Sequence, residues 1–345
     1  MITISSFSKI ALDWFEENQR TLPWRGETDP YKIWVSEIIL QQTRVNQGWE
    51  YYLNFINRFP NLKSLAQAPL QDALQLWQGL GYYSRVCNMH AAAQQIMQKH
   101  QGVFPQDYSD IRNLKGIGNY TAAAIASIAF QQPYPAVDGN VLRVISRIFG
   151  IYDDISQPKT VHKITKICDK LMDKKNPGTF NQALMELGAM QCTPKNPKCE
   201  TCPFTNSCVA LENEEVNLLP FKSLKIKIRE RYFHYFIFLK DSKTIIEQRT
   251  ENDIWKNLYQ FPMIETQNAC TEMEAIAKAD QRQVFDRRGV FLKEVNHKLT
   301  HQHLTIRFYV IKDYLPELQD NQLIVSAEDL VKFPFPVILK EIVIL

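Results

Sequence analysis

Four cysteines crowd into residues 192–208, and their spacing is the most specific chemical pattern in the chain. Cys192, Cys199, Cys202 and Cys208 follow the pattern C-x6-C-x2-C-x5-C. Four thiolates in one short loop can converge on one metal centre. Zinc is one interpretation, but zinc ribbons usually contain two C-x2-C pairs and this loop has one. A compact all-cysteine loop also suits a [4Fe–4S] cluster, and the spacing favours that assignment.

A glycine-containing turn, Leu-Lys-Gly-Ile-Gly-Asn-Tyr-Thr-Ala, occupies residues 114–122 and precedes an alanine-rich segment. Gly116 and Gly118 permit a tight hairpin with outward-facing backbone N–H groups. The N-terminal end of the following helix adds partial positive charge. Together they predict a binding site for a DNA phosphate that does not depend on the DNA sequence. A plain turn between helices is the alternative.

Lys195 and Lys198 lie between the first two cysteines of the four-cysteine loop. They are either solvated surface residues or further contacts to DNA phosphates.

Glu37 is an acidic residue with mostly apolar neighbours, in the segment Trp-Val-Ser-Glu-Ile-Ile-Leu-Gln-Gln-Thr at 34–43. On a helix it shares a face with Ile33 and with Leu40 or Gln41. Apolar surroundings raise the pKa of a carboxyl group, as a general acid at neutral pH requires. An ordinary surface glutamate is the alternative interpretation.

Asp138 follows Gly118 by twenty residues, in Val-Asp-Gly-Asn-Val at 137–141. Aspartate before a helix is commonly an N-cap. It is also placed to display a carboxylate at the mouth of a DNA-binding cleft. Both roles are open at this point.

The elements that must position these residues are mostly helical up to residue 210. Apolar positions recur at helical spacing over residues 6–18, 31–45, 49–58, 70–77, 84–99, 118–130, 138–149, 159–172 and 179–190. Strand patterns then begin at 232–240 and 244–249, a candidate hairpin around Asp241-Ser242-Lys243. Alternation over 304–310 predicts a half-buried strand, and 271–285 reads as a helix.

Composition narrows the class of protein. The chain has 345 residues, long enough for two domains. Hydrophobic residues make up 45% and charged residues 22%, which excludes a wholly disordered chain. The net charge of +3 does not by itself reveal a nucleic-acid binder. We expect no signal peptide and no membrane segment, hence a cytoplasmic protein that associates with the nucleoid when bound to DNA.

Together, the hairpin, the following Asp and the four-Cys loop resemble the helix–hairpin–helix base-excision glycosylases with an iron–sulfur loop. Within that superfamily, endonuclease III-type enzymes carry Lys at the position of Tyr120. The string at 34–43, Leu-Pro-Trp-Arg at 22–25 and Gly-Leu-Gly-Tyr-Tyr-Ser-Arg at 79–85 are typical of the adenine DNA glycosylase (MutY) branch. Leu-Tyr-Gln-Phe-Pro at 258–262 resembles the MutT-like domain of that branch.

The resemblance implies a fold and domain boundaries. The fold is a mainly α helix–hairpin–helix glycosylase domain with an iron–sulfur loop, plus a C-terminal α+β MutT/Nudix-like domain. The expected boundaries are a catalytic domain at 1–211 (helix–hairpin–helix 114–130, iron–sulfur loop 192–208), a linker at 212–228 and a lesion-recognition domain at 229–345. The second domain lacks the G-x5-E-x7-R-E-x2-E-E string, so we expect no nucleotide pyrophosphatase activity.

The resemblance also implies the reaction: a monofunctional enzyme removes adenine mispaired with 8-oxoguanine, and less strongly with guanine, from duplex DNA. Glu37 would protonate adenine N7, Asp138 would stabilise or transiently attack the sugar, Tyr120 would support that step, and Asn140 would orient water. Arg25 and Gln182 would line the adenine pocket. Gln42 and Tyr82 would wedge into the duplex, although core packing is an equal interpretation of Tyr82.

The resemblance further implies a [4Fe–4S] cluster on the four cysteines, a monovalent cation at the helix–hairpin–helix, and a monomer. The lesion-reading turn departs from the usual Phe-Ser-His, because this chain has Leu299, Thr300 and His301. Thr300 still donates and accepts hydrogen bonds, so we expect Thr300 and His301 to read 8-oxoguanine. Two alternatives stay open: an endonuclease III-like pyrimidine-lesion glycosylase/lyase, and a non-catalytic DNA-damage binding module.

Overall fold

A computed structural model describes three stretches of the chain, 4–223, 227–268 and 289–343. Its contacts divide the chain into two units: residues 1–67 with 88–224, and residues 68–87 with 225–345. The helix expected over 271–285 lies outside the described residues. Within the described stretches, every helix is too short or too polar to cross a membrane.

The expected helical character of the first 210 residues is confirmed. In chain order the helices are α1 (Ile4–Asn18), α2 (Pro30–Leu40), α3 (Val45–Arg58), α4 (Leu62–Gln67), α5 (Leu70–Leu76), α6 (Ser84–Lys99), α7 (Tyr108–Arg112), α8 (Asn119–Phe130), α9 (Gly139–Phe149), α10 (Pro158–Leu171), α11 (Pro177–Met190) and α12 (Val209–Glu212), with 3-10 turns at Cys199–Thr201 and Thr205–Ser207.

The boundary between the helices expected over 31–45 and 49–58 was predicted wrongly. The helix expected over 31–45 ends at Leu40, and the next begins at Val45. Gln42 adopts a φ of 58°, a left-handed conformation that an α-helix cannot contain. The chain therefore turns sharply after Leu40, about one helical turn beyond Glu37.

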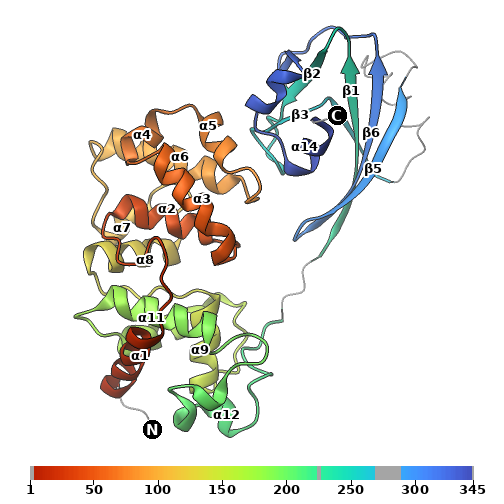
Figure 1. Cartoon of the computed structure of the whole chain (residues 1–345). Helices are drawn as coiled ribbons and strands as arrows, with labels where there is room; N and C mark the ends of the chain where they lie inside the picture. Colours follow the sequence, from red (N-terminus) through yellow and green to blue (C-terminus); the bar gives the residue numbers. More distant parts are fainter. Residues whose placement is uncertain (1–3, 224–226, 269–288, 344–345) are drawn as a thin grey trace. The chain divides into compact units, whose positions relative to one another are not determined.

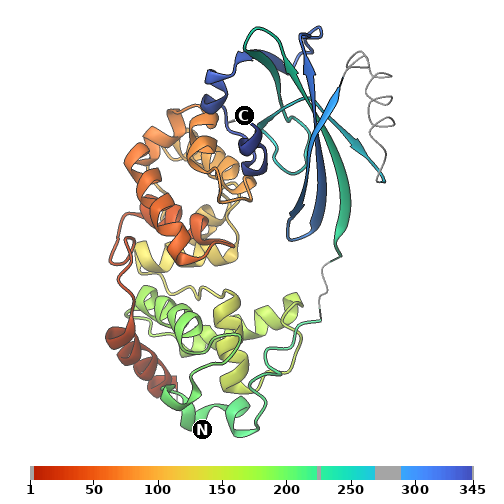
Figure 2. The same cartoon turned by 45° about the vertical axis from the view of Figure 1, so that its right-hand side comes forward.

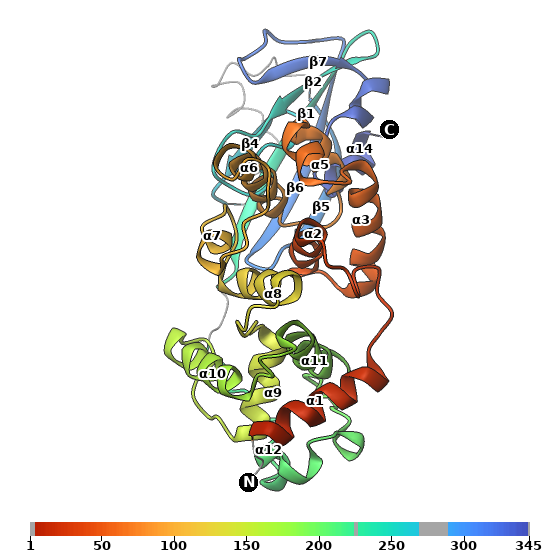
Figure 3. The same cartoon turned by 90° about the vertical axis from the view of Figure 1, so that its left-hand side faces the viewer.

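Two groups of helices build the first unit. In one, α1, α9, α10 and α11 enclose a core with Phe7, Ile145, Ile164, Phe180 and Phe204 (Figures 1 and 2). In the other, α2 packs against α3 and α8 (Figure 3). Helix α8 also contacts α11, so it connects the two groups. The N-terminal ends of α8 and α9 thereby come close to the middle of α2 and α11.

Local sequence explains where the key helices begin. Pro30 at the first position of α2 follows Asp29, whose carboxylate accepts a hydrogen bond from the Tyr31 N–H over 2.9 Å. Helix α9 begins after Asp138, which caps it with its carboxylate, and ends at Phe149, before Gly150 with a φ of 60°.

The second unit holds two sheets. Their strands are β1 (Arg229–Leu239), β2 (Lys243–Gln248), β3 (Tyr259–Gln260), β4 (Met263–Thr266), β5 (Val290–Lys298), β6 (Gln302–Lys312) and β7 (Gln322–Ser326). They are followed by a 3-10 turn (Glu328–Lys332) and α14 (Val337–Val343). One sheet has the order β4-β1-β6-β5 and the other β3-β2-β7. The strand expected over 304–310 is confirmed as part of β6.

The hairpin expected between 232–240 and 244–249 is only half right. Asp241 and Ser242 form a tight turn with φ values of 49° and 57°, closed by backbone hydrogen bonds between Lys240 and Lys243. Beyond that turn the strands separate into different sheets. Strand β1 pairs with β6 in parallel along its whole length (Figure 1), so β2 pairs with β7 instead.

Candidate active site and iron–sulfur loop

A cavity of about 700 Å³ opens in the first unit and gathers most of the predicted site residues. Helix α2, the N-terminal ends of α8 and α9, helix α11 and the turns before and after α2 all contribute to its wall. The predicted residues on the wall are Arg25, Glu37, Gln42, Gly118, Tyr120, Asp138, Asn140 and Gln182.

Glu37 reaches the cavity from the middle of α2, together with Ile33, Leu40 and Gln41. Burial raises the pKa of its carboxyl group to about 7, against a hydrogen bond from Tyr120 that lowers it. The nearby Asp138 raises this pKa further. Glu37 is thus partly protonated at neutral pH and can donate a proton into the cavity.

Tyr120, in the first turn of α8, lies between Glu37 and α11. Its hydroxyl hydrogen-bonds to Glu37 and lies 3.1 Å from Met185 Sδ. Burial and the two neighbouring carboxylates raise its pKa well above 10, so the phenol keeps its proton. A neutral hydroxyl beside Glu37 and Asp138 can donate a hydrogen bond but cannot serve as the amine nucleophile of a lyase.

Asp138 caps α9 and also borders the cavity. One carboxylate oxygen accepts the Val141 N–H over 2.8 Å and caps α9, and the other accepts Asn140 Nδ2 over 2.7 Å. Burial raises the pKa of Asp138, while these hydrogen bonds lower it. The carboxylate borders the same cavity as Glu37, so the cap does not remove it from the site.

Arg25 borders the same cavity and is held by residues of α11. It donates to Gln182 Oε1 over 2.7 Å and to Glu186 Oε2 over 3.2 Å. Its Nε is buried without a partner among the described residues, so this N–H is available to a ligand. Burial lowers the pKa of Arg25.

Glu186 is a site residue that the sequence reasoning missed. Its carboxylate is 4% exposed, borders the cavity, and receives Arg20 Nε over 2.7 Å as well as Arg25. It lies one helical turn after Gln182, so the i, i+4 spacing was the available signal.

The two hairpin glycines differ in whether another residue could replace them. Gly116 has a φ of 78°, and a Cβ there would approach Asn88 Cβ to 2.5 Å, so only glycine fits. Gly118 caps α8 with a φ of −94°, which other residues adopt readily. Open space around Gly118 leaves the backbone accessible at the cavity wall.

The four cysteines line a separate small pocket whose other walls are largely apolar side chains. Arg147, 2% exposed, donates to Cys192 Sγ over 3.3 Å and to the Thr193 carbonyl over 2.8 Å. No three His, Cys, Asp or Glu side chains in the described stretches lie close enough to bind one metal ion. A [4Fe–4S] cluster does not need that, because each cysteine binds a different iron. Four thiols and a basic neighbour therefore fit this group, and Lys195 and Lys198 are exposed beside it.

The remaining predicted residues belong to the second unit. Thr300 and His301 form the tip of the turn between β5 and β6, closed by a 2.7 Å hydrogen bond from the Leu299 N–H to the Gln302 carbonyl. Tyr82, also in this unit, is 44% exposed and has a φ of 47°. Its hydroxyl lies 2.5 Å from Thr300 Oγ1. Tyr82 is therefore displayed at the surface rather than packed in a core.

Three family models match the chain. Residues 35–170 match the HhH-GPD superfamily base excision DNA repair protein, 192–208 the iron–sulfur binding domain of endonuclease III, and 234–345 the NUDIX domain. A thermostable thymine-DNA glycosylase is similar in structure, with a TM-score of 0.57 and 26% identity over 61% of this chain and 97% of that one. An endonuclease III–DNA complex has a TM-score of 0.54 at 20% identity and covers 62% of this chain and 99% of its own, which shows the fold alone.

Fold and site together define a helix–hairpin–helix DNA N-glycosylase of base excision repair that carries a [4Fe–4S] cluster. An adenine DNA glycosylase of Buchnera aphidicola (Schizaphis graminum) is 38% identical over 88% of this chain and 87% of its own. The Arabidopsis thaliana enzyme is 32% identical over 93% of this chain and 53% of its own, and the human one 39% over 64% and 42%. The chain belongs to the adenine DNA glycosylase family.

Proposed function

We propose that this enzyme hydrolyses the N-glycosidic bond of adenine opposite 8-oxoguanine, and less readily opposite guanine, in duplex DNA. The observation that carries the proposal is the pairing of Glu37 and Asp138 on one cavity, with the pKa of Glu37 raised to about 7. Adenine is a poor leaving group until it is protonated, and its departure leaves positive charge on the sugar. One acid must therefore be protonated and the other ionised.

Glu37 donates its proton to N7 of an adenine that has left the base stack. Asp138 then faces C1′ as an anion, and stabilises the cationic sugar or attacks it transiently. Asn140 holds that carboxylate and orients water, while Tyr120, which is hydrogen-bonded to Glu37 and close to Asp138, supports that step. Arg25 and Gln182 bind the adenine, and the bound [4Fe–4S] cluster keeps its loop ordered for DNA binding.

Extrusion of a base leaves a gap in the duplex that protein side chains fill. Gln42, at a tight turn on the cavity wall, and the exposed Tyr82 are the proposed wedges. Thr300 and His301 supply donors and acceptors for the edge of 8-oxoguanine. The hairpin with Gly116 and Gly118 binds a phosphate and a monovalent cation.

These roles assign residues 1–211 to catalysis and 229–345 to lesion recognition, joined by the linker 212–228. We propose further that the enzyme is a cytoplasmic monomer that associates with the nucleoid when it is bound to DNA. Tyr120 in place of lysine disfavours the lyase alternative, and two acids on one cavity disfavour a mere binding module.

The test is a single-turnover panel on duplexes containing A:8-oxoguanine, A:G, thymine glycol or T:G. We expect adenine release from the first two only, faster from A:8-oxoguanine, and no covalent enzyme–DNA adduct after borohydride reduction. Excision of thymine glycol with a trapped adduct would establish the lyase alternative. Binding of A:8-oxoguanine without release of any base would establish the binding module.

A further inference from the structure

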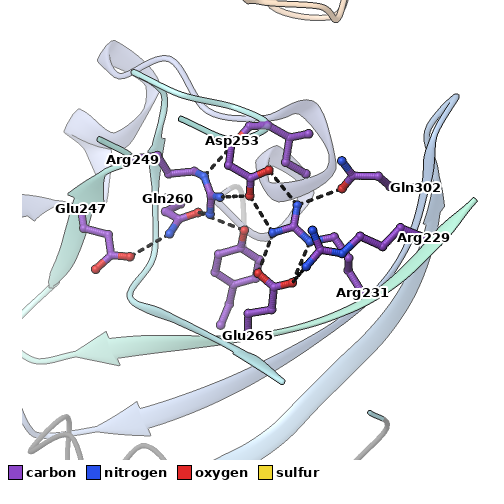
Figure 4. Close-up of polar contacts among 10 residues, drawn as sticks. Arg229, Arg231, Glu247, Arg249, Asp253, Gln260, Glu265 and Gln302 are labelled. Carbon is purple, nitrogen blue, oxygen red and sulfur yellow. Dashed lines mark hydrogen bonds and ion pairs between the residues drawn. The ribbon is translucent and has the colours of Figure 1, made fainter. Parts of the chain in front are cut away.

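A buried arginine lies behind the turn that carries Thr300 and His301. Arg231, near the start of β1, is 4% exposed although it is charged. Figure 4 shows it at the centre of a polar cluster, with Asp253, Glu265 and Gln302 around it. These three residues come from the β2–β3 loop, strand β4 and the first position of β6.

The guanidinium of Arg231 uses all five of its N–H donors. Nε and Nη2 hold Glu265 over 2.7 and 2.6 Å. Nη1 and Nη2 hold Asp253 over 2.9 and 2.6 Å. The last Nη1 donor goes to Gln302 Oε1 over 2.9 Å. Because two carboxylates fix the plane of the guanidinium, this fifth donor has a fixed direction.

Gln302 is the residue directly after His301. Its backbone carbonyl closes the turn by accepting the Leu299 N–H, and its side chain is held by Arg231. On the other flank, the Arg229 N–H donates to the His301 carbonyl over 3.0 Å. The base of the turn is thus held on both sides, and its tip residues, Thr300 and His301, are exposed. The Thr300 hydroxyl also contacts the Tyr82 hydroxyl.

We infer that Arg231, acting through Gln302, is a positioning residue that holds the Thr300–His301 turn in the conformation that reads the base opposite adenine. The inference rests on the proposed function, since it assumes that this turn contacts 8-oxoguanine. Recognition of a base edge depends on the direction of the hydrogen bonds that the protein makes to it. Such hydrogen bonds weaken when the residues that support the binding side chains are not held in place. A buried ion cluster supplies that stiffness to an otherwise exposed two-residue tip.

Gln302 is the better residue to change. Removal of Arg231 would take from Asp253 and Glu265 their shortest ion pairs, and would leave each with one longer pair, to Arg249 and Arg229 respectively. Loss of a partly buried charge pair of this kind would destabilise the whole unit. Gln302 is half-buried and uncharged, so its replacement removes the hydrogen bond from Arg231 and leaves the ion pairs of Arg231 in place. Gln302→Leu removes the acceptor for Arg231, whereas Gln302→Glu keeps an acceptor oxygen at the same position.

Gln322→Leu provides a matched control. Gln322 is also half-buried in this unit, and its side chain donates to Glu247 over 3.2 Å at the far end of the same cluster. It is on β7, in the sheet that does not contain the turn. A general loss of stability would affect both leucine variants, but a loss of turn geometry would affect only Gln302→Leu.

The experiment measures dissociation constants of the full-length, cluster-loaded enzyme for A:8-oxoguanine and A:G duplexes at one salt concentration. We expect Gln302→Leu to lower the preference for A:8-oxoguanine by roughly tenfold, as for one lost base contact. Gln302→Glu should restore the preference, and adenine release from A:G should stay at the wild-type rate.

Three results would overturn the inference: an unchanged preference in Gln302→Leu, an equal loss in Gln322→Leu, or no restoration by Gln302→Glu. Each of these leaves the proposed function standing if the wild-type enzyme prefers A:8-oxoguanine. A wild-type enzyme that binds both duplexes equally overturns the proposed function itself, and the inference with it.

Discussion

Asn140 donates from Nδ2 to Asp138 Oδ2 over 2.7 Å, and its own Oδ1 accepts a hydrogen bond from Arg143 Nη2 over 2.9 Å. Arg143 Nε in turn donates to the Cys192 carbonyl over 2.8 Å. Three hydrogen bonds thus connect the proposed catalytic carboxylate with the first cysteine of the iron–sulfur loop. The position of Asp138 therefore depends on residues well beyond the cavity wall.

The double role of Asp138 gives a sharp prediction for Asp138→Asn. The asparagine side chain still caps α9 by accepting the Val141 N–H, but the negative charge facing the sugar is lost. We expect single-turnover adenine release to fall by roughly 10²–10³-fold. Duplex affinity and melting temperature should stay close to those of the wild type.

Asp138→Ala is the comparison that separates the two roles. It should lose the same catalytic activity and, in addition, about 1 kcal/mol of stability because the helix cap is gone. Wild-type turnover in Asp138→Asn would mean that Asp138 serves as a cap alone.

The raised pKa of Glu37 predicts the pH dependence of the reaction. A general acid acts only while protonated, and the pKa of Glu37 is about 7. We expect the single-turnover rate to fall above pH 7, by about tenfold per pH unit once Glu37 is mostly ionised. At the acidic end the rate should fall again, as Asp138 becomes protonated.

The control for this profile is Glu37→Gln, which cannot donate the proton. Its rate should be lower by about 10²–10⁴-fold and should show no decline between pH 7 and 9. Glu27→Gln changes a glutamate that pairs with Lys32 outside the cavity lining, and should behave like the wild type. A wild-type rate that is constant between pH 7 and 9 would exclude Glu37 as the acid.

Short-range chemistry made much of this site predictable from sequence. The apolar helix around Glu37, the glycine hairpin and the cysteine spacing each depend on neighbours within a few residues. Glu186 was missed because its importance comes from Arg20 and Arg25, more than 160 positions away in the chain. The i, i+4 spacing from Gln182 places Glu186 on the same face of α11, but it does not report the pairing with these two arginines.

The strand pairing of β1 shows the same limit in the fold. Its hairpin turn with β2 was predictable from Asp241 and Ser242, two residues that suit a tight turn. Its real partners are β4 and β6. Strand β6 lies about 70 residues further along the chain, and its pairing with β1 is parallel. Alternating hydrophobicity predicts that a strand exists but does not specify its partner.

Gly188 in α11 offers a test of how closely Asn140 is packed. A Cβ at position 188 would come within 2.5 Å of Asn140 Cβ and 3.1 Å of its backbone. Gly188→Ala must therefore displace Asn140, and with it the hydrogen bond to Asp138. We expect adenine release per folded molecule to fall by about tenfold or more, since misplacement of a catalytic group by 1 Å can cost about 10²-fold.

Gly178→Ala is the matched control in the same helix. Its Cβ would clash almost as closely, at 2.7 Å, but with the Ser127 carbonyl in the last turn of α8. It should lower the melting temperature while the rate per folded molecule stays near the wild-type value. Equal loss of rate in both variants would assign the effect to helix packing in general.

The cysteine loop predicts a joint loss of cluster and DNA affinity. Cys199→Ala removes one of the four thiols of the pocket, and we expect colourless protein with little bound iron. Duplex affinity should fall with it, because Lys195 and Lys198 lie in the same loop and lose their fixed positions. The measurements are iron content, visible absorption and binding to an undamaged duplex.

Cys87→Ala is the control, since Cys87 lies outside that pocket. It should retain the iron, the colour and the affinity of the wild type. Stoichiometric zinc with full activity in the wild-type protein would reverse the metal assignment.

The last prediction concerns Thr300 and His301, at the tip of the β5–β6 turn. Both acids, the hairpin and the cluster loop lie before residue 210, so chemistry should survive changes in this turn. Thr300→Ala combined with His301→Ala removes polar groups that can contact the edge of 8-oxoguanine. We expect the preference for A:8-oxoguanine over A:G to narrow by about 1–3 kcal/mol at most per lost contact.

Deletion of residues 229–345 should narrow the preference further while adenine release from A:G persists. The ratio of dissociation constants for the two mispairs, measured at one salt concentration, is the readout, because phosphate contacts cancel in it. Thr305→Ala, on the same strand but away from the tip, serves as the control for the double variant. If the truncated enzyme keeps the wild-type ratio, reading of the lesion belongs to the helical domain, and the second domain contributes only sequence-independent affinity.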